Sequence, residues 1–187
     1  MNKIRQVWVM WSADDLGFEN TASEIAYELW ETLAKANFIL VYGAEKDGDS
    51  LSATAARWAK SAWWTVMWIT YGQQPDIWND MMKYTDTIVN TWMDRGGWRE
   101  YVLVSSCDAL ISVWGGSWTL NELTIGYQKK IPIVNMKWTW WWSDRLADTY
   151  IDERYKTDPD RFICKWANTP AEAVDYLLKL NERILQK

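Results

Sequence analysis

Short apolar runs alternate with longer segments of helical periodicity along this sequence, and that alternation is what most constrains its fold. The runs are rich in Val, Ile and Met and are apolar on both faces, which is typical of strands buried in a parallel sheet. Helices between such strands return the chain to the start of the next parallel strand, so the pattern predicts a doubly wound α/β domain. We expect about seven strands, at 5–10, 37–42, 64–69, 86–90, 108–113, 131–136 and 161–165.

The clearest helical segments separate these strands or follow the last of them. Thr169, Pro170 and Glu172 form a typical helix start at the head of segment 169–187, because threonine can cap a helix and proline fits its first turn. The other helical segments are 19–36, 50–62 and 117–129. No internal repeat, low-complexity tract or long linker divides the 187 residues. We therefore expect a single Rossmann-like domain over residues 1–187, with helices on both faces of the sheet.

The charge balance and the apolar runs exclude two kinds of partner. The 20 Lys and Arg residues against 25 Asp and Glu give a net charge of -5, and no basic run stands out, so we expect no nucleic-acid partner. No apolar stretch reaches the roughly 18 residues of a membrane span. The sequence also lacks a signal-like pattern at its start. We therefore expect a cytoplasmic protein with no membrane partner.

The rare residue types narrow the chemistry further. The sequence contains no histidine, which excludes histidine-activated serine and cysteine nucleophiles and His-based zinc motifs. Cys107 and Cys164 are far apart and predict neither a zinc site nor a disulfide framework, as is usual in a reducing cytoplasm. Acid–base work would fall to carboxylates, helped by Arg, Lys or Tyr.

The stretch "VWGGSWTLNE" (113–122) follows a predicted strand and opens a predicted helix. A Gly-rich turn in that place is typical of a nucleotide-phosphate loop, because glycine permits close approach to the backbone N–H groups at a helix N-terminus. In a doubly wound sheet, ligands bind where the carboxyl ends of the strands gather. The loops after the first two strands are therefore expected to line the same crevice.

This loop, together with Arg99 at the start of the helix upstream, resembles the LOG ("Lonely Guy") family. The family signature is a Pro/Gly-Gly-Gly-x-Gly-Thr-x-x-Glu loop, preceded by an Arg-Lys or Arg-Asn pair. The resemblance covers almost the whole chain and includes "WSADD" after the first strand, "VYGAEKDGDS" at the second and "MKWTWWWSDRLAD" at the sixth. The chain most resembles a nucleotide-binding branch whose activity is uncertain.

The resemblance implies a nucleoside 5′-monophosphate phosphoribohydrolase, which releases free base and ribose 5-phosphate. Glu122 would stabilise an oxocarbenium-like ribosyl centre or orient water, and Arg99 would orient the ribosyl group or phosphate. The residues alone leave a structural alternative open for each: Glu122 as a helix-capping carboxylate and Arg99 as a partner in a surface salt bridge. The 5′-phosphate cradle would comprise Gly115, Gly116, Ser117 and Thr119, with Ser12, Gly43, Ala44 and a second basic candidate, Arg95, beside it.

A second function stays open: a non-enzymatic sensor of a nucleotide derivative, or a carrier resembling the molybdenum-cofactor carriers of this fold. Glu100 stands where the family has Lys, and this favours the second function. We expect no cofactor and no metal, because loop acids such as Asp14, Asp15, Asp47 and Asp49 are usually solvated. The expected partner is a small-molecule nucleotide, and the family implies a homodimer.

The chain holds 17 Trp but only 9 Gly, whereas average usage predicts about 13 Gly. Placing the family pattern over the sequence puts fifteen of the tryptophans where the family has or tolerates glycine: 8, 11, 30, 58, 63, 64, 68, 92, 98, 114, 118, 138, 140, 141 and 166. Only Trp78 and Trp142 look ordinary. We hypothesise that UGA, which encodes glycine in a few bacterial lineages, has been read as tryptophan. The alternative is a genuinely Trp-rich chain. We expect such a chain to pack poorly and bind no nucleotide, because Trp118 projects its indole where a phosphate meets backbone N–H groups.

Overall fold

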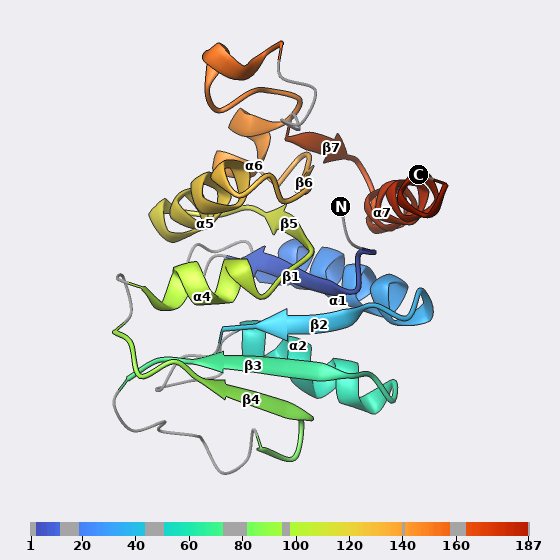
Figure 1. The fold of residues 1–187 in the computed structure, drawn as a ribbon. Helices are drawn as coiled ribbons and strands as arrows, with labels where there is room; N and C mark the ends of the chain where they lie inside the picture. The colour runs from blue at the N-terminus through green and yellow to red at the C-terminus, as the bar shows by residue number, and fades with distance from the viewer. Residues whose placement is uncertain are drawn as a thin grey trace.

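A computed structural model describes residues 3–11, 19–43, 51–72, 82–94, 98–139, 141–157 and 164–186. Its centre is a seven-stranded sheet in the order β4-β3-β2-β1-β5-β6-β7, and every pair of neighbouring strands is parallel (Figure 1). The sequence prediction of a doubly wound parallel sheet is confirmed. The strands are β1 (Gln6–Trp11), β2 (Ile39–Tyr42), β3 (Val66–Thr70), β4 (Thr87–Asn90), β5 (Ala109–Val113), β6 (Ile133–Met136) and β7 (Lys165–Ala167).

Helices cover both faces of this sheet (Figure 1). On one face α1 packs against both α2 and α7, and on the other α4 packs against α5, while α6 lies against β6. The helices are α1 (Glu19–Lys35), α2 (Leu51–Ser61), α4 (Arg99–Ser105), α5 (Ser117–Gln128), α6 (Trp141–Leu146) and α7 (Pro170–Leu185), with a short 3-10 turn η1 (Glu153–Tyr155).

Strand β1 occupies the middle of the sheet. Val7 of β1 faces Leu40 of β2 on one side and Ala109 of β5 on the other. Strands β2 to β4 extend the sheet in one direction and β5 to β7 in the other, so the strand order reverses at β1. In sheets of this kind the ligand crevice lies outside the carboxyl ends of the strands at the reversal, which here means between the ends of β1 and β5.

The two termini of the described chain are joined by a buried side chain. Asn181 of α7 accepts a hydrogen bond from the Ile4 N–H at 2.6 Å and donates one from Nδ2 to the Ile4 carbonyl at 3.0 Å. Both residues are buried. The pair satisfies the backbone ahead of β1, which would otherwise lie unpaired in an apolar setting.

Two elements differ from the sequence prediction. Helix α6 lies within the stretch "MKWTWWWSDRLAD", for which no helix was predicted, because consecutive tryptophans carry no helical periodicity. The last strand is Lys165–Ala167 rather than 161–165, and residues 161–163 lie outside the described residues. Cys164, which belongs to the predicted run, pairs instead with Thr149 in an isolated antiparallel bridge.

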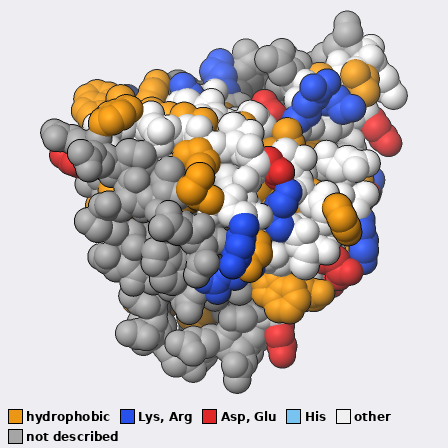
Figure 2. Space-filling model, turned by 90° about the horizontal axis from the view of Figure 1, so that it is seen from below, with side chains coloured by type: hydrophobic (Ala, Val, Ile, Leu, Met, Phe, Trp, Pro, Cys, Tyr) orange, Lys and Arg blue, Asp and Glu red, His pale blue; other side chains and the backbone are white. Residues whose placement is uncertain are grey.

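The surface of the described residues is mixed in character. Figure 2 shows Lys and Arg side chains lying among acidic and hydrophobic ones, without an extended basic surface over the described part of that face. Among the described helices, none has both the length and the apolar character needed to cross a membrane.

Candidate functional site

The turn between β5 and α5 has the geometry of an anion-binding loop. Gly115 has a φ of +104°, which side chains rarely adopt, and a Cβ there would overlap the side chain of Thr119. Gly116 is the N-cap of α5 and has open space beside its Cα, with no side-chain cap hydrogen bond. The first N–H groups of a helix have no intrahelical partner, so a helix of 12 residues that begins in this way favours an anion at its N-terminus.

The two hydroxyl residues of the predicted cradle differ in position. Ser117 is exposed at the mouth of α5, whereas Thr119 is only 1% exposed and packs over Gly115. The side chain of Thr119 therefore supports the loop from inside, and the surface that faces solvent comprises Gly116 and Ser117. The sequence pattern identified both residues but could not separate these two positions.

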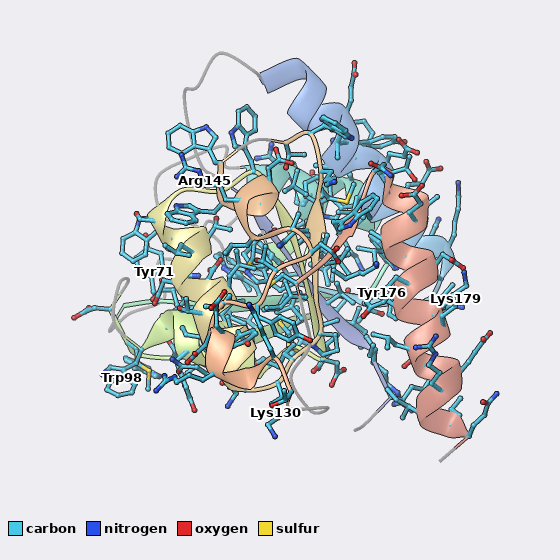
Figure 3. The ribbon with its side chains drawn as sticks, turned by 90° about the horizontal axis from the view of Figure 1, so that it is seen from above. Tyr71, Trp98, Lys130, Arg145, Tyr176 and Lys179 are labelled. Atoms are coloured by element: carbon cyan, nitrogen blue, oxygen red, sulfur yellow. The ribbon has the colours of Figure 1, made fainter. Side chains whose placement is uncertain are left out.

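Arg99 lies at the carboxyl edge of the sheet. It is the first residue of α4, is 5% exposed, and presses against Gly43 at the end of β2, where a Cβ would overlap its Nη1. Its guanidinium carbon is 5.7 Å from the ring centre of Tyr71, which follows β3. In Figure 1 the arrows of β1 to β4 point to the left, and Figure 3 places Tyr71 and Trp98 on that same side, away from α7. Arg99 is thus a buried edge residue rather than part of a surface salt bridge.

Glu122 is buried in α5, with 6% exposure. It lies beyond the first turn of the helix, which holds no acidic residue, so it is not a first-turn cap. Burial, followed by the nearby carboxylates of Glu122 and Asp108, raises the pKa of the Cys107 thiol well above its ordinary value.

Arg99 forms an ion pair with its neighbour Glu100. The Arg99 Nε is 3.4 Å from Glu100 Oε1, and both side chains are almost fully buried. Arg99, Glu100 and Glu122 are all buried, and the helices that carry them, α4 and α5, pack together. The partnership with Glu100 was not predicted from the sequence.

Three predicted site residues, Ser12, Ala44 and Arg95, lie outside the described residues, as do the loop acids Asp14, Asp15, Asp47 and Asp49. Within the described ranges, no group of three or more Cys, Asp or Glu is placed to hold a metal ion. Tyr71 was missed by the sequence analysis. Its place directly after a buried strand was the signal that could have found it.

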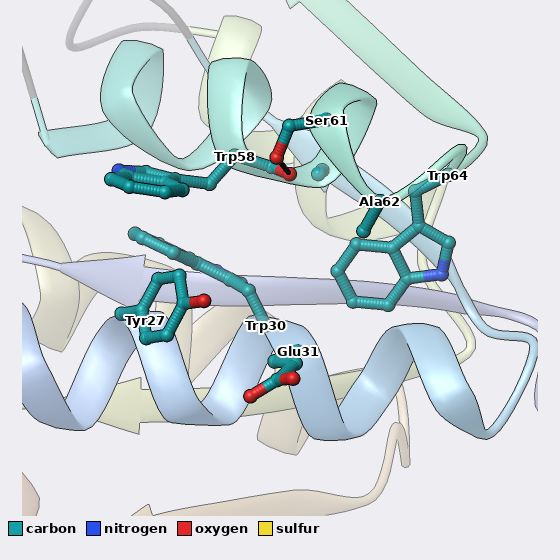
Figure 4. Close-up of a pocket in the computed structure, with 8 residues that line it drawn as sticks. Tyr27, Trp30, Glu31, Trp58, Ser61, Ala62 and Trp64 are labelled. Carbon is teal, nitrogen blue, oxygen red and sulfur yellow. Dashed lines mark hydrogen bonds between the residues drawn. The ribbon is translucent and has the colours of Figure 1, made fainter.

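A cavity of about 240 Å³ lies between α1 and α2, away from the β5–α5 turn (Figure 4). Tyr27 and Trp58 meet edge to face across it, with ring centres 4.9 Å apart. Trp30 and Trp64 complete its aromatic walls, and Glu31 lies at its rim. Three of these wall residues belong to the fifteen tryptophans at glycine-like positions.

Comparison with known proteins places the chain in a family. A protein from Archaeoglobus fulgidus, described only as uncharacterized, is 33% identical over 113 residues, which is 60% of this chain and 69% of that protein. The X-ray structure of the protein TM1055 superimposes with a TM-score of 0.77 at 23% identity, covering 94% of this chain and 99% of that one.

Two further solved structures share the fold. The molybdenum cofactor carrier protein of Chlamydomonas reinhardtii has a TM-score of 0.71 at 21% identity and covers 96% of this chain and 99% of its own. The molybdenum cofactor binding protein of Rippkaea orientalis has a TM-score of 0.67 at 17% identity, with 95% and 97% covered. At these identities the likeness supports the Rossmann-like fold alone. Residues 4–172 match the SLOG cluster4 family, and the chain therefore belongs to that family.

Proposed function

We propose that this protein binds a nucleotide or nucleotide-derived small molecule at the carboxyl edge between β1 and β5. The observation that carries the proposal is the β5–α5 turn, where Gly115 takes a left-handed conformation and Gly116 opens the N-terminus of α5. Backbone N–H groups and the positive end of the helix dipole stabilise a phosphate in that position. Arg99 and Gly43 supply the neighbouring wall from the other side of the strand reversal.

The first candidate activity is hydrolysis of a nucleoside 5′-monophosphate. Water adds to C1′ of the ribose as the N-glycosidic bond breaks, and the base leaves with the balancing proton. Glu122 would stabilise the positive charge on the ribosyl centre or orient the water, and Arg99 would hold the ribosyl group or its phosphate. The burial of both side chains favours this activity, because electrostatic stabilisation is stronger away from water.

The second candidate is a carrier or sensor that binds without reaction. The Arg99–Glu100 ion pair favours it, because the neighbouring carboxylate of Glu100 already lies against the Arg99 guanidinium. Arg99 is then less free to bind a developing charge on a substrate. The two structural relatives described as molybdenum cofactor carrier and binding proteins share the fold and lend this candidate further support.

One assay separates the two candidates. Natively expressed protein is incubated with a panel of nucleoside 5′-monophosphates that includes modified adenines, and released base is detected by chromatography. Release that disappears in Glu122→Gln and persists in Asp175→Asn, an exposed acid on α7, supports the hydrolase. Saturable binding without release supports the carrier. If the protein neither binds nor cleaves any member of the panel, the nucleotide proposal fails. Light scattering on the same sample tests the proposed homodimer.

We also propose that the natural protein carries glycine at the fifteen tryptophan positions named above. The support is conformational: eight described residues other than glycine have positive φ, and five of them are tryptophans, at 63, 92, 114, 138 and 141. Tryptophan makes up 17 of 187 residues, so fewer than one of the eight would be expected by chance. A bulky residue in the left-handed region is strained, whereas glycine is not. All five belong to the fifteen.

Hydrogen bonding and exposure give independent support. The buried indole N–H groups of Trp8, Trp64 and Trp68 have no hydrogen-bond partner, although a buried indole normally finds one. Trp63 and Trp138 are 95% and 74% exposed, so most of the apolar surface of each ring stays in water and adds little to stability. On this proposal the aromatic cavity between α1 and α2 is a product of three substituted glycines and carries no function.

Intact-mass measurement on protein isolated from its natural source tests the glycine proposal. Glycine at fifteen positions removes fifteen indole groups, so the mass falls far below that of the printed sequence. The absorbance at 280 nm falls in parallel, because only Trp78 and Trp142 then remain. A mass equal to that of the printed sequence would refute the proposal.

A further inference from the structure

A chain of buried polar side chains runs beneath the β5–α5 turn. Ser112 at the end of β5, Asn135 of β6 and Ser143 of α6 are all fully buried. Ser112 Oγ is 2.5 Å from Asn135 Oδ1 and 2.7 Å from Ser143 Oγ. Ser143 Oγ in turn donates to the carbonyl of residue 114 at 2.7 Å, and the Ser143 backbone N–H reaches the same carbonyl at 3.1 Å. The chain therefore ends on the backbone of the candidate phosphate loop.

Counting protons fixes the direction of this chain. If Ser112 donates to Asn135 Oδ1 and Ser143 donates to carbonyl 114, no proton remains for the 2.7 Å contact between the two serines. In that arrangement the buried Asn135 Nδ2 also has no partner. Rotating the amide by half a turn corrects both faults, because Nδ2 then donates to Ser112, Ser112 to Ser143, and Ser143 to carbonyl 114.

The rotated amide also suits its other neighbour. Burial raises the pKa of the Cys164 thiol to about 12 and outweighs a hydrogen bond from the Asn135 side chain that lowers it, so the thiol keeps its proton and can face the rotated Oδ1. A protonated thiol is a weak donor to an amide oxygen. The side-chain polar atoms of Ser112, Asn135 and Ser143 then all have partners, which is the expected condition for groups that are fully buried.

A second contact from the same segment holds the other side of residue 114. Thr139, between β6 and α6, accepts a hydrogen bond from the N–H of residue 114 at 3.0 Å and donates its own proton to the Met136 carbonyl at 2.7 Å. The N–H and the carbonyl of residue 114 are thus both fixed by the β6–α6 segment. These contacts involve the backbone of residue 114, so they are the same for tryptophan and glycine.

We infer that Ser143 and Thr139 are positioning residues that hold the 114–116 turn in the shape in which the N-terminus of α5 binds phosphate. This inference rests on the proposed function. Thr139 is 25 residues from residue 114 in the sequence, and Ser143 is 29 residues from it. The folding of the chain, and not closeness in sequence, therefore brings these two residues of "TWWWS" (139–143) to the loop. Neither side chain touches the ligand. Each acts through the backbone that precedes Gly115.

The test isolates the phosphate contribution to binding in natively expressed protein. Affinities for ribose 5-phosphate and ribose are measured by calorimetry or NMR titration, and their ratio is compared among variants. Ser143→Ala is expected to lower the ratio about fivefold to tenfold, the equivalent of one buried hydrogen bond. Ser112→Ala should have a smaller effect, because Ser143 keeps its donor to carbonyl 114. Thr139→Val should lower the ratio because valine lacks the hydroxyl, whereas Thr139→Ser keeps the hydroxyl and should have a ratio close to that of wild-type protein.

Thr149→Val is the matched control, since its hydroxyl also bonds a backbone carbonyl but lies beyond α6. Thermal melts of every variant monitor folding, and the Thr139→Val and Thr139→Ser pair carries the test if Ser143→Ala fails to fold. If wild-type protein prefers ribose 5-phosphate and all variants keep that preference, the inference is overturned while the proposed function stands. If wild-type protein shows no preference for the phosphate, the proposed phosphate site fails, and this inference fails with it.

Discussion

The end of α2 offers a direct measure of the strain carried by a left-handed tryptophan. Trp63 has a φ of 62° and follows the last turn of the helix. Its N–H donates to the Lys60 carbonyl at 3.1 Å, and the next N–H, of Trp64, donates to the Ala59 carbonyl at 3.0 Å. This pair of bonds defines a Schellman motif with Trp63 at the position that glycine usually occupies.

The same motif recurs at the end of α1 with an ordinary residue. Asn37 has a φ of 58°, and the N–H groups of Asn37 and Phe38 bond back to Ala34 and Leu33 at 2.8 and 3.2 Å. Asparagine tolerates the left-handed conformation better than other residues with side chains. The two helix ends therefore form a matched pair, which differs mainly in the residue at the strained position.

In protein produced with tryptophan at every position printed as such, replacing Trp63 by glycine should stabilise the fold. The left-handed conformation lowers the stability of the folded state by about 1–2 kcal/mol when the residue has a side chain. Glycine removes that strain, but its greater freedom in the unfolded chain offsets about 0.5–1 kcal/mol of the gain. The indole is 95% exposed, so its removal loses little buried area. We expect a net gain of about 1 kcal/mol for Trp63→Gly, seen as a rise of about 2–4 °C in Tm for a chain of this size.

Two control variants make that result specific. Trp98→Gly removes an indole that is 69% exposed, but Trp98 has a φ of -97°, so we expect a small loss of stability. Asn37→Gly should change stability by only a few tenths of a kcal/mol. The measurement is the midpoint of thermal or urea unfolding for all three. A Tm for Trp63→Gly at or below that of Trp98→Gly would contradict the strain argument.

Three further predictions concern stability and reactivity. Asn181→Leu leaves two buried backbone groups ahead of β1 unpaired, and urea unfolding should show a loss of about 2–3 kcal/mol. Burial tends to raise the pKa of Asp86, but hydrogen bonds from Lys60 and a backbone N–H outweigh burial and lower that pKa. The ionised Asp86 therefore stabilises the folded state above its unfolded pKa, and this stabilisation is lost as pH falls through the folded pKa. Asp86→Asn should therefore weaken the dependence of stability on pH between about pH 5 and pH 2, measured by urea unfolding. Burial also raises the pKa of Cys107, and that of Cys164 to about 12, so neither thiol should react with a disulfide reagent at about pH 8 until the protein is unfolded.

The architecture was predictable because local signals agree with the fold. The predicted helix 117–129 differs from α5 by one residue at its end, since two glycines mark the start of the helix and its apolar positions are periodic. The predicted strand 108–113 coincides with β5 within one residue, because a strand buried on both faces gives an unbroken apolar run.

The site was only partly predictable, because its contacts join residues that are distant in sequence. Arg99 and Gly43 were both predicted as site residues, but their direct contact depends on how α4 crosses the end of β2. The Arg99–Glu100 pair was missed because adjacent helical residues do not normally face each other, and only shared burial brings these two together. Residues 139–143 were singled out only by their resemblance to a family, since no spacing rule links them to the β5–α5 turn.

The central place of β1 has a consequence for the order in which the molecule can be assembled. Strand β1 is synthesised before its partner on one side, residues 109–113, and before Asn181, which completes the backbone hydrogen bonds at Ile4. Until those segments have been made, one edge of β1 presents unpaired backbone groups, which is the condition that invites aggregation. Parallel pairing over such a span also slows folding. The backbone pairing of β1 and of Ile4 is therefore complete only when residues 109–113 and Asn181 are also present.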